Sequence, residues 1–227
     1  MAEIILALDV DSADAGRRLL DRLPALRWVK VGSVLMTREG APFIMELRAR
    51  GLQVFLDLKW HDIPSTVAGA VAAASSLGVA MATVHTLGGA AMMRAAQDAA
   101  GVLGLVGVTV LTSHDAAGYA DATGRGGVDL ELEVARLAGA AGAAGLRGVV
   151  CSPAEIPVAR AALEARAWVV VPGIRRAADA AGDQVRTATP REAVARGATH
   201  LVVGRPISKA ADPGAVLAEC MAEAGAT

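Results

Sequence analysis

The feature of this sequence that most constrains its fold is a unit that recurs along the whole chain. Each unit is a short apolar run followed by an amphipathic stretch rich in alanine and leucine. Runs of this kind, hardly interrupted by polar residues, are typical of parallel strands buried on both faces. The predicted strands are Ile4–Leu8, Trp28–Val31, Val54–Leu58, Met81–Val84, Leu105–Val110, Gly148–Cys151, Trp168–Val171 and Leu201–Val203.

The stretches between these runs carry the helical spacing of apolar residues, often after an N-cap residue and before a glycine. Examples of the predicted helices are Ala13–Leu23, Pro42–Arg50, Ser65–Leu77, Ala90–Ala100, Leu130–Ala144 and Glu192–Arg196. Eight strand–helix units in 227 residues, about 28 residues each, suit a compact barrel. We therefore predict the α/β class and a (β/α)8 TIM barrel, with residues 1–227 forming one domain.

An open, doubly wound sheet is the alternative arrangement for alternating strands and helices. Such a sheet normally has a glycine-rich G-x-G-x-x-G turn after its first strand. Here the first strand runs directly into Asp9, Val10 and Asp11. The pattern therefore favours the barrel over the open sheet.

The balance of charges limits the partners that this protein can have. The chain has 22 basic and 23 acidic residues, and aromatic residues make up only 3%. Nucleic-acid and membrane-surface binding favour a basic excess, and base stacking needs aromatic side chains. The N-terminus also lacks the basic region of a signal peptide. We expect a small-molecule substrate, no nucleic acid, no membrane partner and a cytoplasmic location.

One segment is long enough to suggest a membrane span. From Ile63 to Met93 there is no Asp, Glu, Lys or Arg, and about 20 apolar residues suffice to cross a bilayer. However, Pro64, Gly78 and His85 divide the segment into helix, turn, strand and loop. A buried strand–helix unit is therefore the better interpretation.

Polar residues follow every predicted strand. In a TIM barrel the active site lies at the carboxyl ends of the strands. A polar residue at one strand end need only mark where that strand meets water, but eight of them favour a functional site. These residues are Asp9, Lys30, Asp57, His85, Thr109, Ser152, Arg175 and Arg205.

The densest cluster of charges is the segment from Asp57 to Asp62. Strand alternation predicts that Asp57 and Lys59 share one face and point into the mouth of the barrel. Lys30, one strand away, can join them in an alternating network of charges that holds each head group in place. A purely structural ladder of salt bridges is the alternative. The chain has 19 arginines and only three lysines, which favours chemistry because lysine can give up a proton and arginine effectively cannot.

A second cluster follows the last two predicted strands. Phosphate sites in these barrels are commonly built from the loops after strands seven and eight. Gly204 lets the backbone approach an anion and Arg205 can bind the anion with two hydrogen bonds. The segment from Asp179 to Arg186 is long enough to form a lid. The four histidines lack metal-ligand spacing, so we expect no metal and no cofactor.

These motifs together resemble those of the orotidine 5′-phosphate decarboxylase family in its bacterial form. The segment Asp57-Leu58-Lys59-Trp60-His61-Asp62-Ile63-Pro64 is similar to the family signature D-x-K-x-x-D-I-P. The resemblance extends from the first strand, at Leu6-Ala7-Leu8-Asp9, to the last, at Val203-Gly204-Arg205-Pro206. Trp60 stands where relatives usually have Phe, and Ser65 where Asn is common.

The resemblance implies a role for each matching residue in the decarboxylation of orotidine 5′-monophosphate to uridine 5′-monophosphate and CO2. It makes Lys59 the acid that protonates C6 of the pyrimidine, beside Asp57 at the departing carboxylate. It also implies a homodimer with composite sites, in which Asp62, Ile63 and Thr66 come from the other subunit. The remaining implied contacts are Lys30 and Asp9 with the ribose, Thr112 with the base, Gln184 with base and phosphate, and Gly204 and Arg205 with the phosphate, next to Arg175.

Two other functions remain open at this point. One is a metal-dependent sugar-phosphate decarboxylase or aldolase of the same superfamily, which shares the D-x-K-x-x-D core. Ile63-Pro64 and Gln184 favour the nucleotide enzyme. The other is a non-catalytic nucleotide-binding barrel, which would need Gly204 and Arg205 but not the charged cluster around Lys59.

Overall fold

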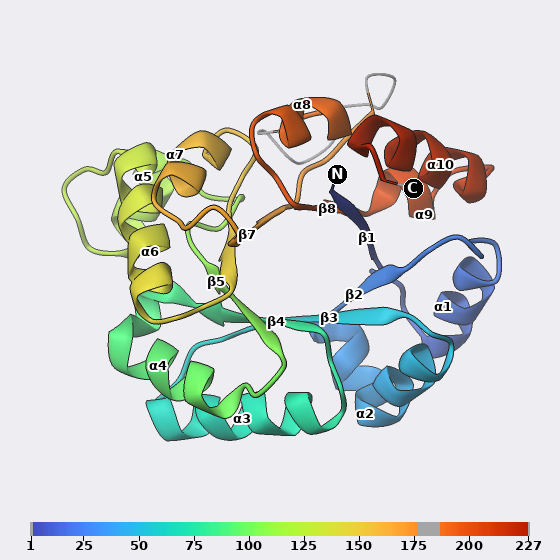
Figure 1. Ribbon diagram of the computed structural model, residues 1–227, viewed down its shortest axis with the longest axis horizontal. Helices are drawn as coiled ribbons and strands as arrows, with labels where there is room; N and C mark the ends of the chain where they lie inside the picture. The colour runs from blue at the N-terminus through green and yellow to red at the C-terminus, as the bar shows by residue number, and fades with distance from the viewer. Residues whose placement is uncertain (1, 177–186, 227) are drawn as a thin grey trace.

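The computed structural model describes residues 2–176 and 187–226. Its eight parallel strands form a closed barrel in sequence order, with β1 paired to both β2 and β8 (Figure 1). The predicted (β/α)8 barrel is therefore confirmed. The strands are β1 (Glu3–Ala7), β2 (Trp28–Gly32), β3 (Gln53–Trp60), β4 (Met81–His85), β5 (Gly104–Val108), β6 (Gly148–Val150), β7 (Trp168–Val171) and β8 (His200–Val203).

Helices surround the barrel as an outer ring (Figure 1). Helices α3 and α4 pack against each other and against β4, and α3 also packs against β3. The helices are α1 (Ala13–Leu20), α2 (Ser33–Ala49), α3 (Pro64–Ser76), α4 (Gly89–Ala99), α5 (Ala116–Ala122), α6 (Leu130–Ala143), α7 (Ile156–Ala161), α8 (Pro190–Ala195), α9 (Arg205–Ser208) and α10 (Pro213–Ala224), with a 3-10 turn η1 (Thr86–Gly88).

The second helix differs most from the prediction. The expected helix began at Pro42, whereas α2 begins at Ser33 and includes a kink at Gly40, where φ is +63°. Two helices therefore abut there. Pro42 suits the first turn of the second of them, because proline fixes φ at a helical value and its missing N–H is not needed in a first turn.

Other boundaries also differ from the prediction. Helix α1 ends at Leu20 rather than Leu23, and β3 continues past Leu58 to Trp60. Four helices, α5, α7, α9 and α10, had been given no bounds beforehand, and three of them have fewer than eight residues, too short for a clear periodicity. The predicted lid, Asp179 to Arg186, lies outside the described residues.

Two apolar clusters hold the barrel together. The larger one lies between the strands and the outer helices and includes Cys151, as a small buried residue. The smaller one fills the interior of the barrel, where side chains from successive strands meet as a packed core. Its buried members are Ile5, Ala7, Trp28, Phe55, Met81, Val106, Val170 and Val202.

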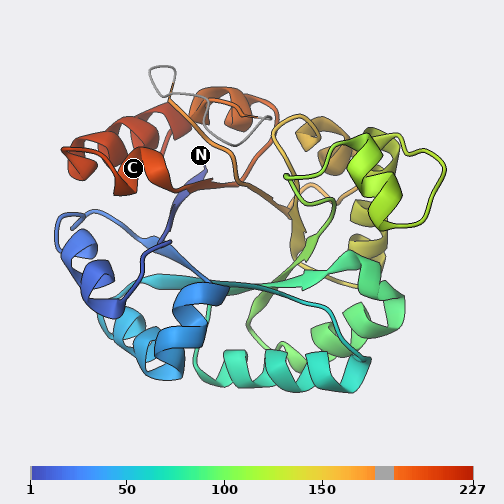
Figure 2. The same ribbon diagram turned by 180° about the vertical axis from the view of Figure 1, so that it is seen from behind.

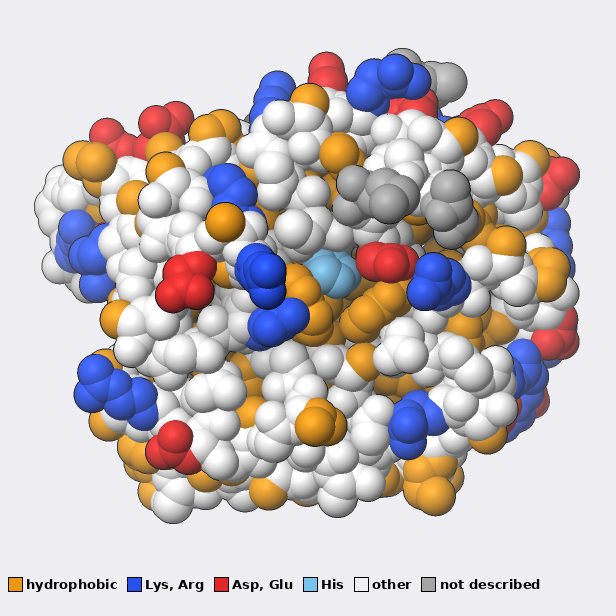
Figure 3. All heavy atoms as spheres, in the orientation of Figure 1, with side chains coloured by type: hydrophobic (Ala, Val, Ile, Leu, Met, Phe, Trp, Pro, Cys, Tyr) orange, Lys and Arg blue, Asp and Glu red, His pale blue; other side chains and the backbone are white. Residues whose placement is uncertain are grey.

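An aromatic cluster closes the end of the barrel at which the strands begin. His200 lies between Trp28 and Trp168, with ring centroids 5.5 Å and 4.9 Å away, and is only 5% exposed. Figure 3 views this end and shows a histidine near its centre, among hydrophobic side chains. Access to the interior is therefore from the opposite end.

His200 makes the stability of the fold depend on pH. Burial, and secondarily the charge of Arg147, lower the pKa of His200 from 6.5 to about 4. As the pH falls below 6.5, His200 binds a proton in the unfolded chain but stays neutral in the folded chain. The folded state therefore loses stability between pH 6.5 and pH 4. We expect the His200 contribution to the free energy of unfolding to fall by roughly 2 kcal/mol between pH 7 and pH 5.

Urea denaturation at these two pH values checks this prediction. His200→Gln provides the comparison, because it keeps a polar side chain but cannot titrate. The wild type should lose more stability than the variant on going from pH 7 to pH 5. Equal losses in the two proteins would contradict the assignment to His200.

Within the described part of the chain, every helix is too short or too polar to cross a membrane. The segment from Ile63 to Met93 forms α3, β4, η1 and the start of α4. The interpretation of this segment as a buried strand–helix unit is therefore confirmed. The cytoplasmic location stays a prediction.

Candidate active site

Four charged side chains form a continuous chain at the end of the barrel where the strands finish, which faces the viewer in Figure 2. Lys59 Nζ lies 2.9 Å from Asp57 Oδ1, and Lys30 Nζ lies 3.6 Å from Asp57 Oδ2. Lys30 Nζ also lies 3.2 Å from Asp9 Oδ1. The order is therefore Asp9, Lys30, Asp57, Lys59. The structure thus brings together the Lys-Asp-Lys part of the predicted Lys-Asp-Lys-Asp alternation, and its second acid is Asp9, beside Lys30, rather than an acid beyond Lys59.

This network is buried in its middle and open to solvent at both ends, because the side chain of Asp9 is 68% exposed. The side chains of Lys30 and Asp57 are 13% and 14% exposed, whereas that of Lys59 is 41% exposed. Lys30 sits between two carboxylates and Asp57 between two ammonium groups, so each buried charge has opposite charges on both sides. The Lys59 ammonium group and the Asp9 carboxylate are therefore the accessible ends of the network.

The backbone at Lys59 departs from an ordinary strand. Lys59 has φ +52°, and no other non-glycine residue in the described ranges has a positive φ. This left-handed conformation costs about 1–2 kcal/mol for a residue with a Cβ atom. The pairing of β3 with β4 shifts at the same point, between Leu56 and Trp60. The conformation therefore coincides with a bulge-like break in the β3–β4 register, a feature often found next to active sites.

The sequence analysis missed one residue of this cluster, Thr83. It lies in β4, is fully buried, and its Oγ1 accepts a hydrogen bond from the Lys59 N–H at 2.8 Å. The same hydroxyl donates to Asp57 Oδ1 at 3.1 Å. No sequence signal marked Thr83, because it stands inside the apolar run Met81–Val84.

Three adjoining hollows open around the network. The innermost, of about 140 Å³, is lined by Lys30, Asp57, Lys59 and Thr112 together with apolar residues from several strands. A second, of about 320 Å³, lies between Asp9 and the start of α2. The predicted base contact, Thr112, thus faces the same space as the Lys59 ammonium group.

The third hollow, of about 480 Å³, is rich in positive charge. The loops after β7 and β8 line it, as predicted, through Arg175, Gly204 and Arg205. Lys209, at the end of α9, also lines it and had been given no role. Asp9 and Lys30 line its inner side, so this hollow continues directly into the charged network.

The structure does not bring Asp62 into this network. Asp62 Oδ1 accepts a hydrogen bond from the N–H of the next residue, Ile63, at 2.6 Å. Asp62 and Thr66 are exposed, and the Ile63 side chain is 63% exposed. These three residues therefore lie on the surface beside the site, and within the described chain Asp62 forms no ion pair.

Two histidines that the sequence analysis treated as scattered lie together. The rings of His61 and His85 stack with centroids 5.3 Å apart. Burial, and then the charges of His61 and Lys59, lower the pKa of His85 to about 4. His85 Nδ1 accepts a hydrogen bond from the Leu87 N–H at 3.3 Å, which agrees with a neutral ring.

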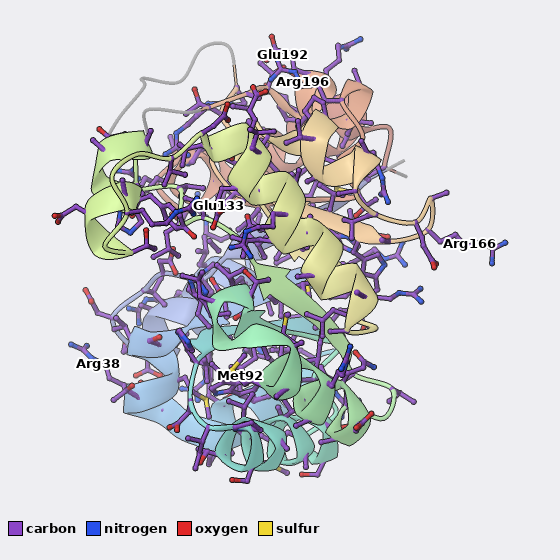
Figure 4. All side chains as sticks on the ribbon, turned by 90° about the vertical axis from the view of Figure 1, so that its left-hand side faces the viewer. Arg38, Met92, Glu133, Arg166, Glu192 and Arg196 are labelled. Carbon is purple, nitrogen blue, oxygen red and sulfur yellow. The ribbon has the colours of Figure 1, made fainter. Side chains whose placement is uncertain are left out.

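A buried carboxylate stabilises the segment that carries Thr112. Glu133 of α6 accepts a hydrogen bond from Tyr119 OH at 2.9 Å and pairs with Arg125 at 3.0 Å and Arg136 at 2.7 Å. These hydrogen bonds, led by that of Arg136, hold the pKa of Glu133 at about 2. Figure 4 shows Glu133 between α6 and the α5 segment. The segment between β5 and α6 is thus held against α6 by Glu133.

Two further predictions concern the Gln184 contact and the absence of a metal ion. Gln184 lies outside the described residues, so its predicted contact with base and phosphate stays a prediction. Among residues 2–176 and 187–226, no group of three or more His, Cys, Asp or Glu side chains is placed to hold a metal ion.

Comparison with known proteins places this geometry in a family. The family model described as "Orotidine 5'-phosphate decarboxylase / HUMPS family" matches residues 2–220. The chain belongs to this family. The expectation drawn from the motifs around Lys59 is therefore confirmed at the level of the family.

Individual members of the orotidine 5′-phosphate decarboxylase / HUMPS family match over nearly the full chain. An orotidine 5′-phosphate decarboxylase of Halorhodospira halophila is 50% identical, over 98% of this chain and 96% of the relative. One of Dichelobacter nodosus is 49% identical, over 96% and 97%. The crystal structure of orotidine 5′-phosphate decarboxylase from Lactobacillus acidophilus has a TM-score of 0.89 and 35% identity, with full coverage of both chains.

Proposed function

We propose that this protein decarboxylates orotidine 5′-monophosphate to uridine 5′-monophosphate and CO2, a step in pyrimidine biosynthesis. The observation that carries the proposal is the Lys59–Asp57 pair, 2.9 Å apart, in a charged network whose other end, Lys30 and Asp9, lines a cationic hollow. An ammonium beside a carboxylate suits a substrate that loses a carboxylate and gains a proton at one carbon. The relatives named above support the same substrate.

The chemistry requires electrostatic stabilisation of a carbanion. The bond between C6 and the carboxylate breaks, CO2 leaves, and the electron pair stays on C6, where the ring delocalises it poorly. A Lys59 ammonium placed at C6 stabilises this charge and then donates its proton there. Water returns the proton to the Lys59 amine. No oxidant, reductant or electron sink takes part in this scheme, so we propose that it needs no cofactor.

The rest of the network positions these two groups. Asp57 lies beside the departing carboxylate, and its negative charge favours departure of that group. Lys30, between Asp57 and Asp9, orients Asp57 and binds the ribose, and Asp9 binds a ribose hydroxyl. In this arrangement Thr112 meets the edge of the base. The proposed Gln184 contact would link base and phosphate.

The cationic hollow suits the 5′-phosphate. Arg205 and Arg175 line it, and Gly204 allows the backbone to approach an anion. The phosphate is remote from the bond that breaks, so its binding energy can hold the base against Lys59.

We expect Arg205→Ala to act through the phosphate. Removal of a charged contact should cost about 2–5 kcal/mol of transition-state binding, on the scale measured for buried charge pairs. The value of kcat/KM is measured with orotidine 5′-monophosphate and with orotidine, which lacks the phosphate. The loss should be large with the first substrate and small with the second.

Arg166→Ala is the matched control for Arg205→Ala. Arg166 is an exposed arginine just before β7, far from the site, and its side chain points away from the barrel in Figure 4. Its removal should leave both substrates unaffected. If Arg205→Ala lowered kcat/KM equally for both substrates, the proposed contact between Arg205 and the phosphate would be contradicted.

We further propose a homodimer with composite sites. Ile63, Val34 and Leu87 follow neighbouring strands β3, β2 and β4, and their side chains are 63%, 61% and 40% exposed. Large apolar side chains exposed beyond the ends of neighbouring strands suit a protein interface. Asp62 and Thr66 flank Ile63 at this rim. We propose that a second copy covers the rim and that Asp62, Ile63 and Thr66 complete the partner's site.

One assay separates the proposed function from its two rivals. The purified protein is incubated with orotidine 5′-monophosphate, and the loss of ultraviolet absorbance is followed with and without a strong chelator. We expect turnover that the chelator leaves unchanged. Activity that is lost with chelator and restored by a divalent cation would favour the sugar-phosphate branch, and binding without turnover would favour a non-catalytic barrel.

A further inference from the structure

We infer that Thr83 is a positioning residue that holds Lys59 and Asp57 in their working arrangement. This inference rests on the proposed function, because it concerns the same reacting groups. Thr83 is fully buried, and its hydroxyl bonds to both residues at once, accepting from the Lys59 N–H and donating to Asp57 Oδ1.

The pairing of the strands explains why a side chain is needed there. Leu56 of β3 pairs with Ala82 of β4, and the next pair joins Trp60 to Val84. Three residues of β3, 57–59, therefore lie opposite a single residue of β4, Thr83. The break in register takes the Lys59 N–H out of the regular ladder, and a partly buried N–H without a partner is costly. The Thr83 hydroxyl supplies that partner.

The same hydroxyl also restricts the catalytic carboxylate. A hydroxyl has one proton to donate, and here that proton goes to Asp57 Oδ1. The Lys59 ammonium contacts this same oxygen at 2.9 Å. Three hydrogen bonds therefore form a closed ring. The Lys59 N–H donates to the Thr83 hydroxyl, the Thr83 hydroxyl donates to Asp57 Oδ1, and the Lys59 ammonium group donates to the same Asp57 oxygen.

This ring links the unusual backbone of Lys59 to its chemistry. With φ at +52°, Lys59 occupies a conformation that the surrounding structure must hold in place. If the Thr83 hydroxyl is absent, Lys59 can relax toward ordinary strand geometry and its ammonium group moves relative to Asp57. Displacements of about 1 Å in a reacting group can cost about 100-fold in rate. The substrate contacts at the phosphate end would be unchanged.

Three variants of Thr83 separate positioning from packing. Thr83→Val keeps the shape and removes the hydroxyl, Thr83→Ser keeps the hydroxyl and removes the methyl group, and Thr83→Ala removes both. We expect kcat to fall by about 10- to 100-fold in Thr83→Val, with KM changed by less than about 3-fold. Thr83→Ser should keep kcat within about 3-fold of wild type even where its Tm is lower.

Thr86→Val is the matched control. Thr86 is also a buried threonine, and its hydroxyl donates to the Val108 carbonyl at 2.7 Å rather than to the charged network. This variant should keep kcat while losing thermal stability. If Thr83→Val does not fold, the comparison of Thr83→Ser with Thr83→Ala carries the test, and Ala must lose at least about ten times more in kcat than Ser.

The results of these experiments distinguish the positioning role of Thr83 from the proposed decarboxylase function. Activity that follows the Thr83 hydroxyl rather than Tm supports the inference. A wild-type kcat in Thr83→Val, or equal losses in the Ser and Ala variants, would overturn it while leaving the proposed function intact. A wild-type protein without turnover of orotidine 5′-monophosphate would instead overturn the proposed function.

Discussion

Lys59→Ala is expected to abolish decarboxylation of orotidine 5′-monophosphate while leaving the fold intact. The substitution removes both the positive charge that stabilises the C6 carbanion and the proton that C6 receives. The Lys59 side chain is 41% exposed, so its loss leaves no buried cavity. The initial rate of absorbance loss and the thermal unfolding curve are the two measurements. A variant with a substantial residual rate would show that another group donates the proton.

Lys59→Arg distinguishes the charge from the acid. The positive charge survives in this variant, but a guanidinium is a poor acid and its planar fork differs in shape from an ammonium group. We expect this variant to be nearly as inactive as Lys59→Ala. Activity close to that of wild type would mean that the positive charge alone is enough.

Asp62→Ala is expected to be severely impaired as well, and a mixture of it with Lys59→Ala is expected to regain activity. In a mixed dimer with composite sites, one site carries both substitutions and the other carries neither. Random exchange of subunits makes about half of the dimers mixed, so activity can approach about one quarter of the wild-type value per total site. The assay compares the mixture, after subunit exchange, with each variant alone.

Different results would contradict the proposed composite site and the proposed dimer. Heterodimers that form without recovered activity would show that Asp62 serves its own subunit's site. The single-chain geometry motivates the test, because Asp62 Oδ1 contacts only the neighbouring Ile63 N–H among the described residues. A chain that is monomeric at assay concentration and still fully active would contradict the dimer itself.

The sequence predicted the charged network because the pattern of strands determines its geometry. Asp57 and Lys59 stand two residues apart at the end of an apolar run, and parallel strands in sequence order place Lys30 on the neighbouring strand. The loops after the last two strands likewise predicted Arg175 and Arg205 in one hollow. In each case a charged residue at a strand end was the signal.

The features that sequence reasoning missed depend on register and side-chain packing. Thr83 has its role because the pairing of β3 with β4 shifts opposite it, and no local pattern shows that shift. The stacking of His61 on His85 likewise depends on how the β3 and β4 ends approach each other. Lys209 lies four residues after Arg205, on a helix that is too short to show a periodicity. Alternation alone predicted that Lys59 and Asp57 share one face, but not the positive φ of Lys59.

The central claim, that this chain decarboxylates orotidine 5′-monophosphate through Lys59, is tested most directly by product stoichiometry. Uridine 5′-monophosphate and CO2 are measured together, in the presence of chelator, for the wild type and for Lys59→Ala purified in the same way. We expect equal amounts of both products from the wild type and neither from the variant. Product formation at the same rate in both preparations, or consumption of substrate without CO2, would contradict it.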